Sequence, residues 1–96
     1  MGFVQIIKLS TADYTGVEAA HEEWLSATEG QRTVTREILC ENRDVPGEFW
    51  VIVEFPSYDD AMRNNALPAT AKIAEQIAAL SGGQLEFFNL DLRRQD

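Results

Sequence analysis

The sequence predicts a single α+β domain, on the evidence of its length, its composition and the order of its apolar segments. The chain has 96 residues, enough for one domain (1–96) and too few for two. Hydrophobic residues make up 45% and charged residues 25%, which is typical of a globular protein rather than a disordered one. Short β-branched segments alternate with segments of helical spacing, and this mixture indicates both strands and helices.

The first part of the chain is expected to form a strand, a helix and a second strand. Residues 3–9 are apolar, β-branched and of strand length. Apolar residues then recur at helical spacing, at Val17, Ala20, Trp24 and Ala27. Thr11 and Asp13 are possible N-caps of this helix, and Gly30 follows where it should end. Residues 33–42 return to strand character.

The second part is expected to form a strand, a helix and a last strand. Residues 48–55 predict the clearest strand of the chain, after a turn containing proline and glycine. Ser57 should cap the next helix. Pro68 has no amide hydrogen to donate, so we expect a kink or break between helical segments 57–66 and 69–80. Residues 84–92 read as the final strand.

The resulting order, β-α-β-β-α-β, is that of the ferredoxin-like fold. It predicts a four-stranded antiparallel sheet with both helices on one face. The strands, however, are apolar on both faces. In strand 48–55, Trp50 and Ile52 lie opposite the alternating set Phe49, Val51, Val53 and Phe55. We therefore expect a homodimer in which two sheets pack together about a two-fold axis, unless the excess reflects loose patterning at strand ends.

Charge and motif content exclude several classes of function. The formal net charge is −8, which disfavours nucleic-acid and membrane-surface partners. The longest apolar run, 50–53, is far too short to span a bilayer, and no signal peptide is evident, so we expect a cytoplasmic protein. A single cysteine, Cys40, and the lack of a phosphate-binding loop or metal-ligand spacing predict no metal and no cofactor.

Four polar residues are candidates for chemistry: Asn64, Asn65, His21 and Glu54. Asn64 and Asn65 carry amides that can orient a phenol or stabilise a developing oxyanion, although asparagine is also common before a helix break. His21 is the single histidine, and as a general base it could deprotonate a phenol before reaction with oxygen. It could equally be a boundary residue at the edge of the apolar stripe.

Trp24 and Trp50 are candidate walls for an aromatic substrate, although core packing would also explain them. Glu54 shares a strand face with Trp50, where a carboxylate needs a partner. One hairpin register places Glu37 opposite Glu54, which would make one of them a catalytic acid or base. A one-residue slip pairs Arg36 with Glu54 instead. Apolar segregation favours the first register and charge pairing favours the second.

The chain resembles the dimeric α/β-barrel superfamily, and in particular antibiotic-biosynthesis monooxygenase-type domains. The resemblance rests on the element order, the doubly apolar sheet and the strand-to-helix run 53–61, followed by Asn64-Asn65 and Leu67-Pro68. It implies a pocket between sheet and helices and, among other activities, cofactor-free oxygenation of polycyclic phenols. Haem-handling relatives can use a histidine where this chain has Asn65, and the asparagine suits an oxygenase that orients its substrate by hydrogen bonding.

Three functions are consistent with these features. The first is a cofactor-independent, monooxygenase-like enzyme that acts on a hydrophobic or aromatic small molecule. The second is a module that binds such a molecule without turnover. The third is a structural dimerisation domain, which would require a filled core instead of a cavity.

Overall fold

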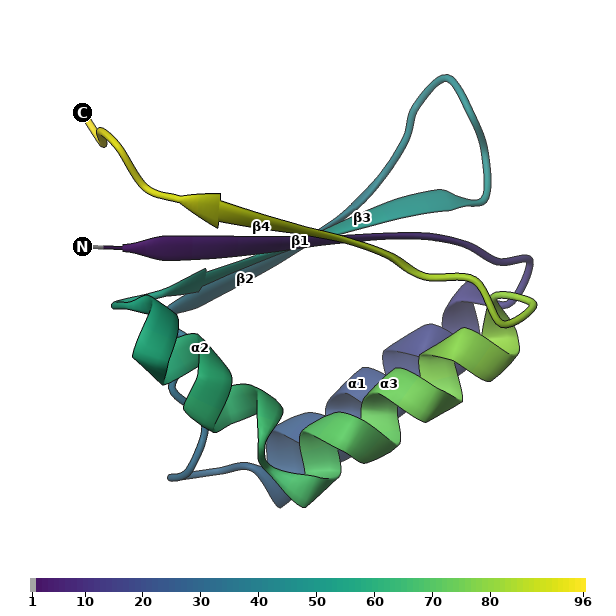
Figure 1. Cartoon of the computed structure of the whole chain (residues 1–96). Helices are drawn as coiled ribbons and strands as arrows, with labels where there is room; N and C mark the ends of the chain where they lie inside the picture. Colours follow the sequence, from purple (N-terminus) through teal and green to yellow (C-terminus); the bar gives the residue numbers. More distant parts are fainter. Residues whose placement is uncertain (1) are drawn as a thin grey trace.

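A computed structural model describes residues 2–96 and contains four strands and three helices (Figure 1). In chain order these are β1 (Phe3–Ser10), α1 (Tyr14–Ala27), β2 (Arg36–Glu41), β3 (Glu48–Phe55), α2 (Tyr58–Asn65), α3 (Pro68–Leu80) and β4 (Glu86–Asp91). The strands form one antiparallel sheet in the order β2-β3-β1-β4. The ferredoxin-like fold is therefore confirmed.

All three helices lie on the same side of the sheet, with α1 and α3 side by side and α2 below the other end (Figure 1). We call the side that they cover the inner face and the opposite side the outer face. The helices begin where local chemistry favours it. The Asp13 side chain accepts a hydrogen bond from Gly16 N at 2.9 Å, and Ser57 Oγ accepts one from Asp60 N at 3.1 Å.

The expected interruption at Pro68 is a complete break. Leu67 is extended, and Pro68 opens α3 at a position where a missing amide hydrogen costs little. The second helical segment of the simple β-α-β-β-α-β order thus becomes two helices. Figure 1 shows α2 turning sharply into α3, which lets one segment cover both ends of the inner face.

The β2–β3 hairpin has the register that pairs opposite charges. Arg36 lies opposite Glu54 and Glu37 lies opposite Val53, so the alternative pairing of Glu37 with Glu54 is wrong. Arg36 Nε is 2.5 Å from Glu54 Oε2 on the outer face. The inward position of Glu37 breaks the apolar segregation of the inner face, and it is tolerated because His21 on α1 meets this carboxylate.

The buried core is divided into two clusters. One groups Phe3, Val53, Phe55 and Ala61 between the sheet and α2, and the other groups Leu9, Val17 and Phe49 towards the C-terminal end of α3. Residues of both clusters line a single cavity between them. The helices therefore seal the sheet at its ends and leave space near its centre.

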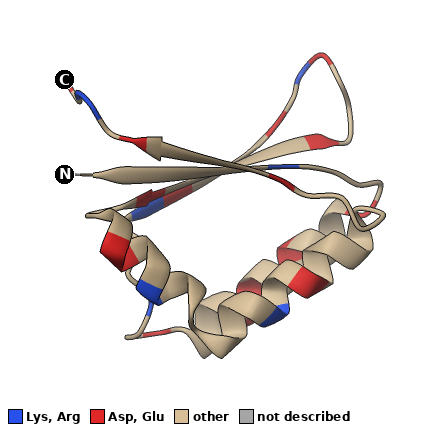
Figure 2. Ribbon diagram, viewed as in Figure 1, with Lys and Arg blue, Asp and Glu red and all other residues tan. Residues whose placement is uncertain are grey.

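The outer face has no helix over it in the part of the chain that the structure describes (Figure 1). Its central side chains are apolar: Val4 and Ile6 of β1, Ile38 and Cys40 of β2, Trp50 and Ile52 of β3, and Phe88 and Leu90 of β4. Phe88 is 40% exposed and Leu90 45% exposed. Figure 2 shows the acidic residues spread over the helices and the β2–β3 hairpin.

Among residues 2–96, no helix combines the length and the apolar character needed to cross a membrane.

Candidate functional site

A cavity of about 260 Å³ lies between the inner face and the three helices. Its wall is predominantly apolar, with side chains such as Ile7, Leu39, Val51 and Ile77. The lining residues that reach solvent include Ala74 on α3 and Phe87 on β4, which is 51% exposed. The cavity therefore opens between α3 and the edge strand β4.

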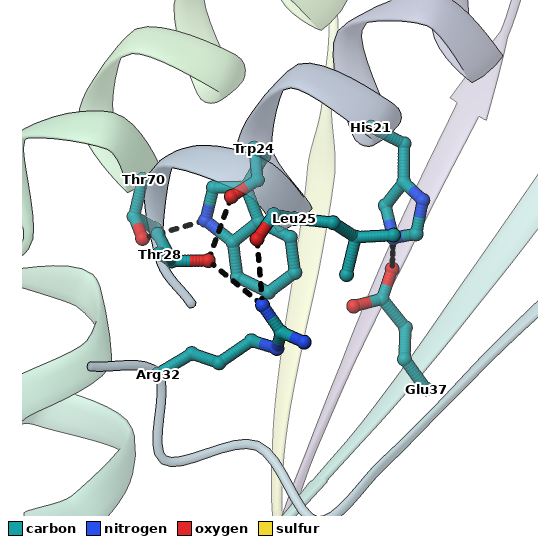
Figure 3. Close-up of polar contacts among 7 residues, drawn as sticks. All are labelled: His21, Trp24, Leu25, Thr28, Arg32, Glu37 and Thr70. Atoms are coloured by element: carbon teal, nitrogen blue, oxygen red, sulfur yellow. Dashed lines mark hydrogen bonds and ion pairs between the residues drawn. The ribbon is translucent and has the colours of Figure 1, made fainter. Parts of the chain in front are cut away.

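His21 and Glu37 form the charged part of the cavity wall. His21 comes from α1 and Glu37 from β2, and His21 Nε2 lies 2.6 Å from Glu37 Oε1 (Figure 3). Nε2 is buried, and the Glu37 carboxylate is the group in direct contact with it, through hydrogen bonding and through charge. The contact with Glu37 raises the pKa of His21 above 6.5, although burial acts in the opposite direction.

Trp24 forms a rigid part of the wall next to His21. Its side chain is 6% exposed, and its indole Nε1 donates a hydrogen bond to Thr70 Oγ1 at 3.0 Å (Figure 3). The Arg32 guanidinium lies 5.8 Å from the centre of the indole ring. Arg32 is itself held by the carbonyl oxygen of Leu25, at 2.8 Å. These contacts fix the indole plane, as stacking against a flat substrate requires.

The two adjacent asparagines of α2 both line the cavity but differ in burial. Asn64 is only 4% exposed, and its Oδ1 has no hydrogen-bond partner within residues 2–96. Asn65 is exposed, so it lies where the cavity meets solvent. A buried acceptor without a partner costs about 1–3 kcal/mol, so Asn64 Oδ1 favours a donor inside the cavity.

The other two candidate residues lie on the outer face. Glu54 is paired with Arg36, and Trp50 Nε1 donates to Glu48 Oε1 at 2.9 Å. The structure thus separates the predicted site into two groups. His21, Trp24, Asn64 and Asn65 line the cavity, whereas Glu54 and Trp50 point away from it. Their placement makes a shared site with His21 impossible within one chain.

Two residues of the site escaped sequence reasoning. The sequence suggests a chemical role for Glu37 only when it faces Glu54, although the charge-pairing register turns it towards the helices. Thr70, which holds the Trp24 indole, lies in the first turn of α3 and carries no signal in the sequence. Its role depends on a contact between residues 46 positions apart.

No protein-family model matches this sequence, and no curated protein matches it significantly. Solved structures do. Rv0793 from Mycobacterium tuberculosis is 13% identical, with a TM-score of 0.81 over 99% of this chain and 98% of that one. An antibiotic biosynthesis monooxygenase candidate from Caulobacter crescentus is 11% identical, with a TM-score of 0.82 over 97% and 91%. SnoaB from Streptomyces nogalater, described as a cofactor-independent oxygenase, is 18% identical, with a TM-score of 0.81 over 98% and 95%.

The chain has the antibiotic-biosynthesis-monooxygenase-type fold. The expected resemblance is thereby confirmed at the level of the fold, over nearly the whole chain. The polar groups that line the cavity include one titratable pair and one buried amide oxygen without a partner among the described residues. Such a set can hold a hydroxylated apolar molecule and accept a proton from it.

Proposed function

We propose that this chain is a cofactor-independent, monooxygenase-like enzyme acting on a hydrophobic or aromatic small molecule that carries a hydroxyl group. One observation carries the proposal. A predominantly apolar cavity holds a histidine–carboxylate pair and a buried amide oxygen that lacks a partner. A purely structural core would contain apolar side chains in these places, because unpaired buried polar atoms are destabilising.

In the proposed reaction, neutral His21 accepts the phenolic proton and leaves an electron-rich phenolate in the cavity. The phenolate and an adjacent CH₂ group then react with dioxygen. The CH₂ carbon is oxidised to C=O, one oxygen atom enters the product, and the other leaves as water with both hydrogens. The substrate supplies the electrons, so the balance requires no further reductant.

The remaining residues bind and orient the substrate in this proposal. Asn64 Oδ1 accepts a hydrogen bond from a substrate hydroxyl, and Asn65 contacts the substrate at the mouth. Trp24 stacks against the aromatic rings, since Thr70 and Arg32 hold its indole in place. Trp50 and Glu54 lie on the outer face and take no part in this cavity.

Oxygen consumption with a panel of hydroxylated polycyclic aromatics tests the activity. We expect turnover by the wild type and its loss in His21→Gln, with ligand binding retained. Loss of turnover with binding retained in Asn65→Ala would place Asn65 in the reaction, and loss of both would place it in binding only. Binding without oxygen uptake across the panel would contradict the enzyme and favour a binding module.

The outer face supports a second proposal, that two copies associate through it. The eight apolar residues of its centre have no cover from the described part of the chain, and a second copy would supply one. Native mass spectrometry of gently purified protein tests this association and detects any retained small molecule at the same time. A monomer at micromolar concentration would contradict it.

A further inference from the structure

Glu37 stands out because it is a half-buried carboxylate placed in an apolar wall. Its neighbours on the inner face of the sheet include Val53, directly opposite on β3, and Leu39, two residues along β2. The Glu37 side chain is 19% exposed, and its partner His21 is 30% exposed. A carboxylate in such surroundings loses hydration and destabilises the fold unless a cation or hydrogen-bond donor compensates it.

The charged groups around His21 make Glu37 its principal partner. Glu37 reaches it from β2 at 2.6 Å, Glu22 acts from the same helix, and Arg32 acts from the loop after α1. Arg32 opposes protonation of the imidazole, whereas both carboxylates favour it. Arg32 is engaged elsewhere, through the Leu25 carbonyl and the Trp24 ring, which leaves Glu37 as the group in direct contact.

We infer that Glu37 is a positioning residue that orients His21 as the base. The substrate part of this inference rests on the proposed function. The Glu37 carboxylate selects the tautomer of neutral His21 that carries its proton on Nε2. Nδ1 is then left with a lone pair, and it is the atom that takes the substrate proton.

The proton transfer balances without any further group. The phenolic O–H bond breaks, an Nδ1–H bond forms, and the phenolate keeps the electron pair. The imidazolium now carries protons on both nitrogens, and the adjacent Glu37 carboxylate compensates its charge. Because Glu37 touches His21 and acts through it, its removal should alter the base and leave the apolar wall in place.

NMR of His21 tests this directly, because it is the single histidine of the chain and its ring signals need no assignment. Long-range ¹H–¹⁵N spectra across a pH series report both its pKa and its neutral tautomer. We expect the wild type to titrate above 6.5 and to carry the Nε2–H tautomer when neutral. Glu37→Gln should titrate at lower pH, and Glu37→Asp should recover part of the difference.

Glu41→Gln is the matched control, because Glu41 lies on the same strand and face but bonds to Gly47 N, 3.0 Å away. It should titrate as the wild type does. An Nδ1–H tautomer in the wild type, or the same pKa in wild type and Glu37→Gln, would overturn the inference. If Glu37→Gln fails to fold, the neutral tautomer of His21 in the wild type alone tests whether Glu37 positions His21.

A phenolic probe then separates this inference from the proposed function. The ionised fraction of bound 2-naphthol is read from its absorbance, with 2-methoxynaphthalene as the analogue that has no proton to transfer. We expect bound 2-naphthol to ionise well below the pH at which free 2-naphthol ionises. In Glu37→Gln, the ratio of ionised to neutral bound 2-naphthol should fall about tenfold for each pKa unit that His21 loses. Failure of 2-naphthol to bind would contradict the proposed substrate class, while the NMR result would still decide the role of Glu37. Equal ionisation in both proteins would overturn that role.

Discussion

The two faces of the sheet each carry a glutamate in apolar surroundings, and the two glutamates have different partners. On the inner face, Glu37 is largely removed from water and meets His21 at the wall of a cavity. On the outer face, the neighbouring residue Arg36 is 62% exposed and pairs with Glu54 at the end of an apolar surface. Consecutive residues of one strand thus serve a candidate site and a surface ion pair.

The difference shows that register, rather than residue type, decides which carboxylate faces the cavity. Glu37 and Glu54 are chemically identical, and a shift of one residue would place them opposite each other and remove the present partners of both. The carboxylate that faces the cavity gains a titratable partner and a dry environment. The Glu54 carboxylate on the outer face is about as buried as Glu37, but its partner Arg36 is 62% exposed, and an ion pair with a solvated partner contributes little.

The largest change in the free energy of unfolding should come from truncating Trp24 on the inner face, with Trp50 on the outer face as the comparison. Trp24→Ala removes a buried indole and its bond to Thr70, so we expect a loss of about 3–5 kcal/mol in the free energy of unfolding. Trp50→Ala removes a partly exposed indole and should cost clearly less in the monomer. Urea denaturation at matched concentration measures both. Equal losses would contradict the assignment of buried and uncovered faces.

The outer face should next respond to a charge at its centre. Phe88→Asp places a carboxylate among the apolar residues, so the proposed dimer should dissociate into monomers that keep their fold. Native mass spectrometry and circular dichroism measure the two properties. Val45→Asp, at a 48% exposed residue of the hairpin loop, is the control and should leave the assembly unchanged. Similar behaviour of both variants would argue against this interface.

The inner pair should make stability depend on pH. Because the pKa of His21 is raised on folding, the pair stabilises the protein fully below pH 6.5, and this stabilisation is lost as the pH rises through the folded pKa. After allowance for solvent screening we expect about 0.5–1 kcal/mol. Urea denaturation between pH 5 and 9 should show this decline in the wild type and in Glu54→Gln, but not in Glu37→Gln. A decline that persists in Glu37→Gln would assign it to another group.

The smallest effect should come from the outer ion pair. Arg36 is mostly solvated, so Arg36→Ala should change the free energy of unfolding by no more than about 1 kcal/mol. The change should shrink further in high salt, as screening of an exposed pair requires. A loss several times larger, insensitive to salt, would mean that this pair holds the hairpin register.

Much of the fold could be predicted because its signals are local. The break at Pro68, the cap at Ser57 and the end of the first helix before Gly30 each depend on residues close in sequence. Part of the site followed as well, since His21 and Trp24 share one helix face and Asn64-Asn65 precede the helix break. The placement of Trp50 and Glu54 on the outer face also follows from strand alternation.

The sequence by itself determined the order of elements, the two apolar faces and a short list of polar residues, because periodicity and turn chemistry act over a few residues. Only the tertiary structure decided the hairpin register, the contact between His21 and Glu37 and the hydrogen bond from Trp24 to Thr70. These are contacts between distant segments. Their outcome depends on the balance between pairing charges and segregating apolar side chains, and that balance is set when the whole sheet and its helices pack together.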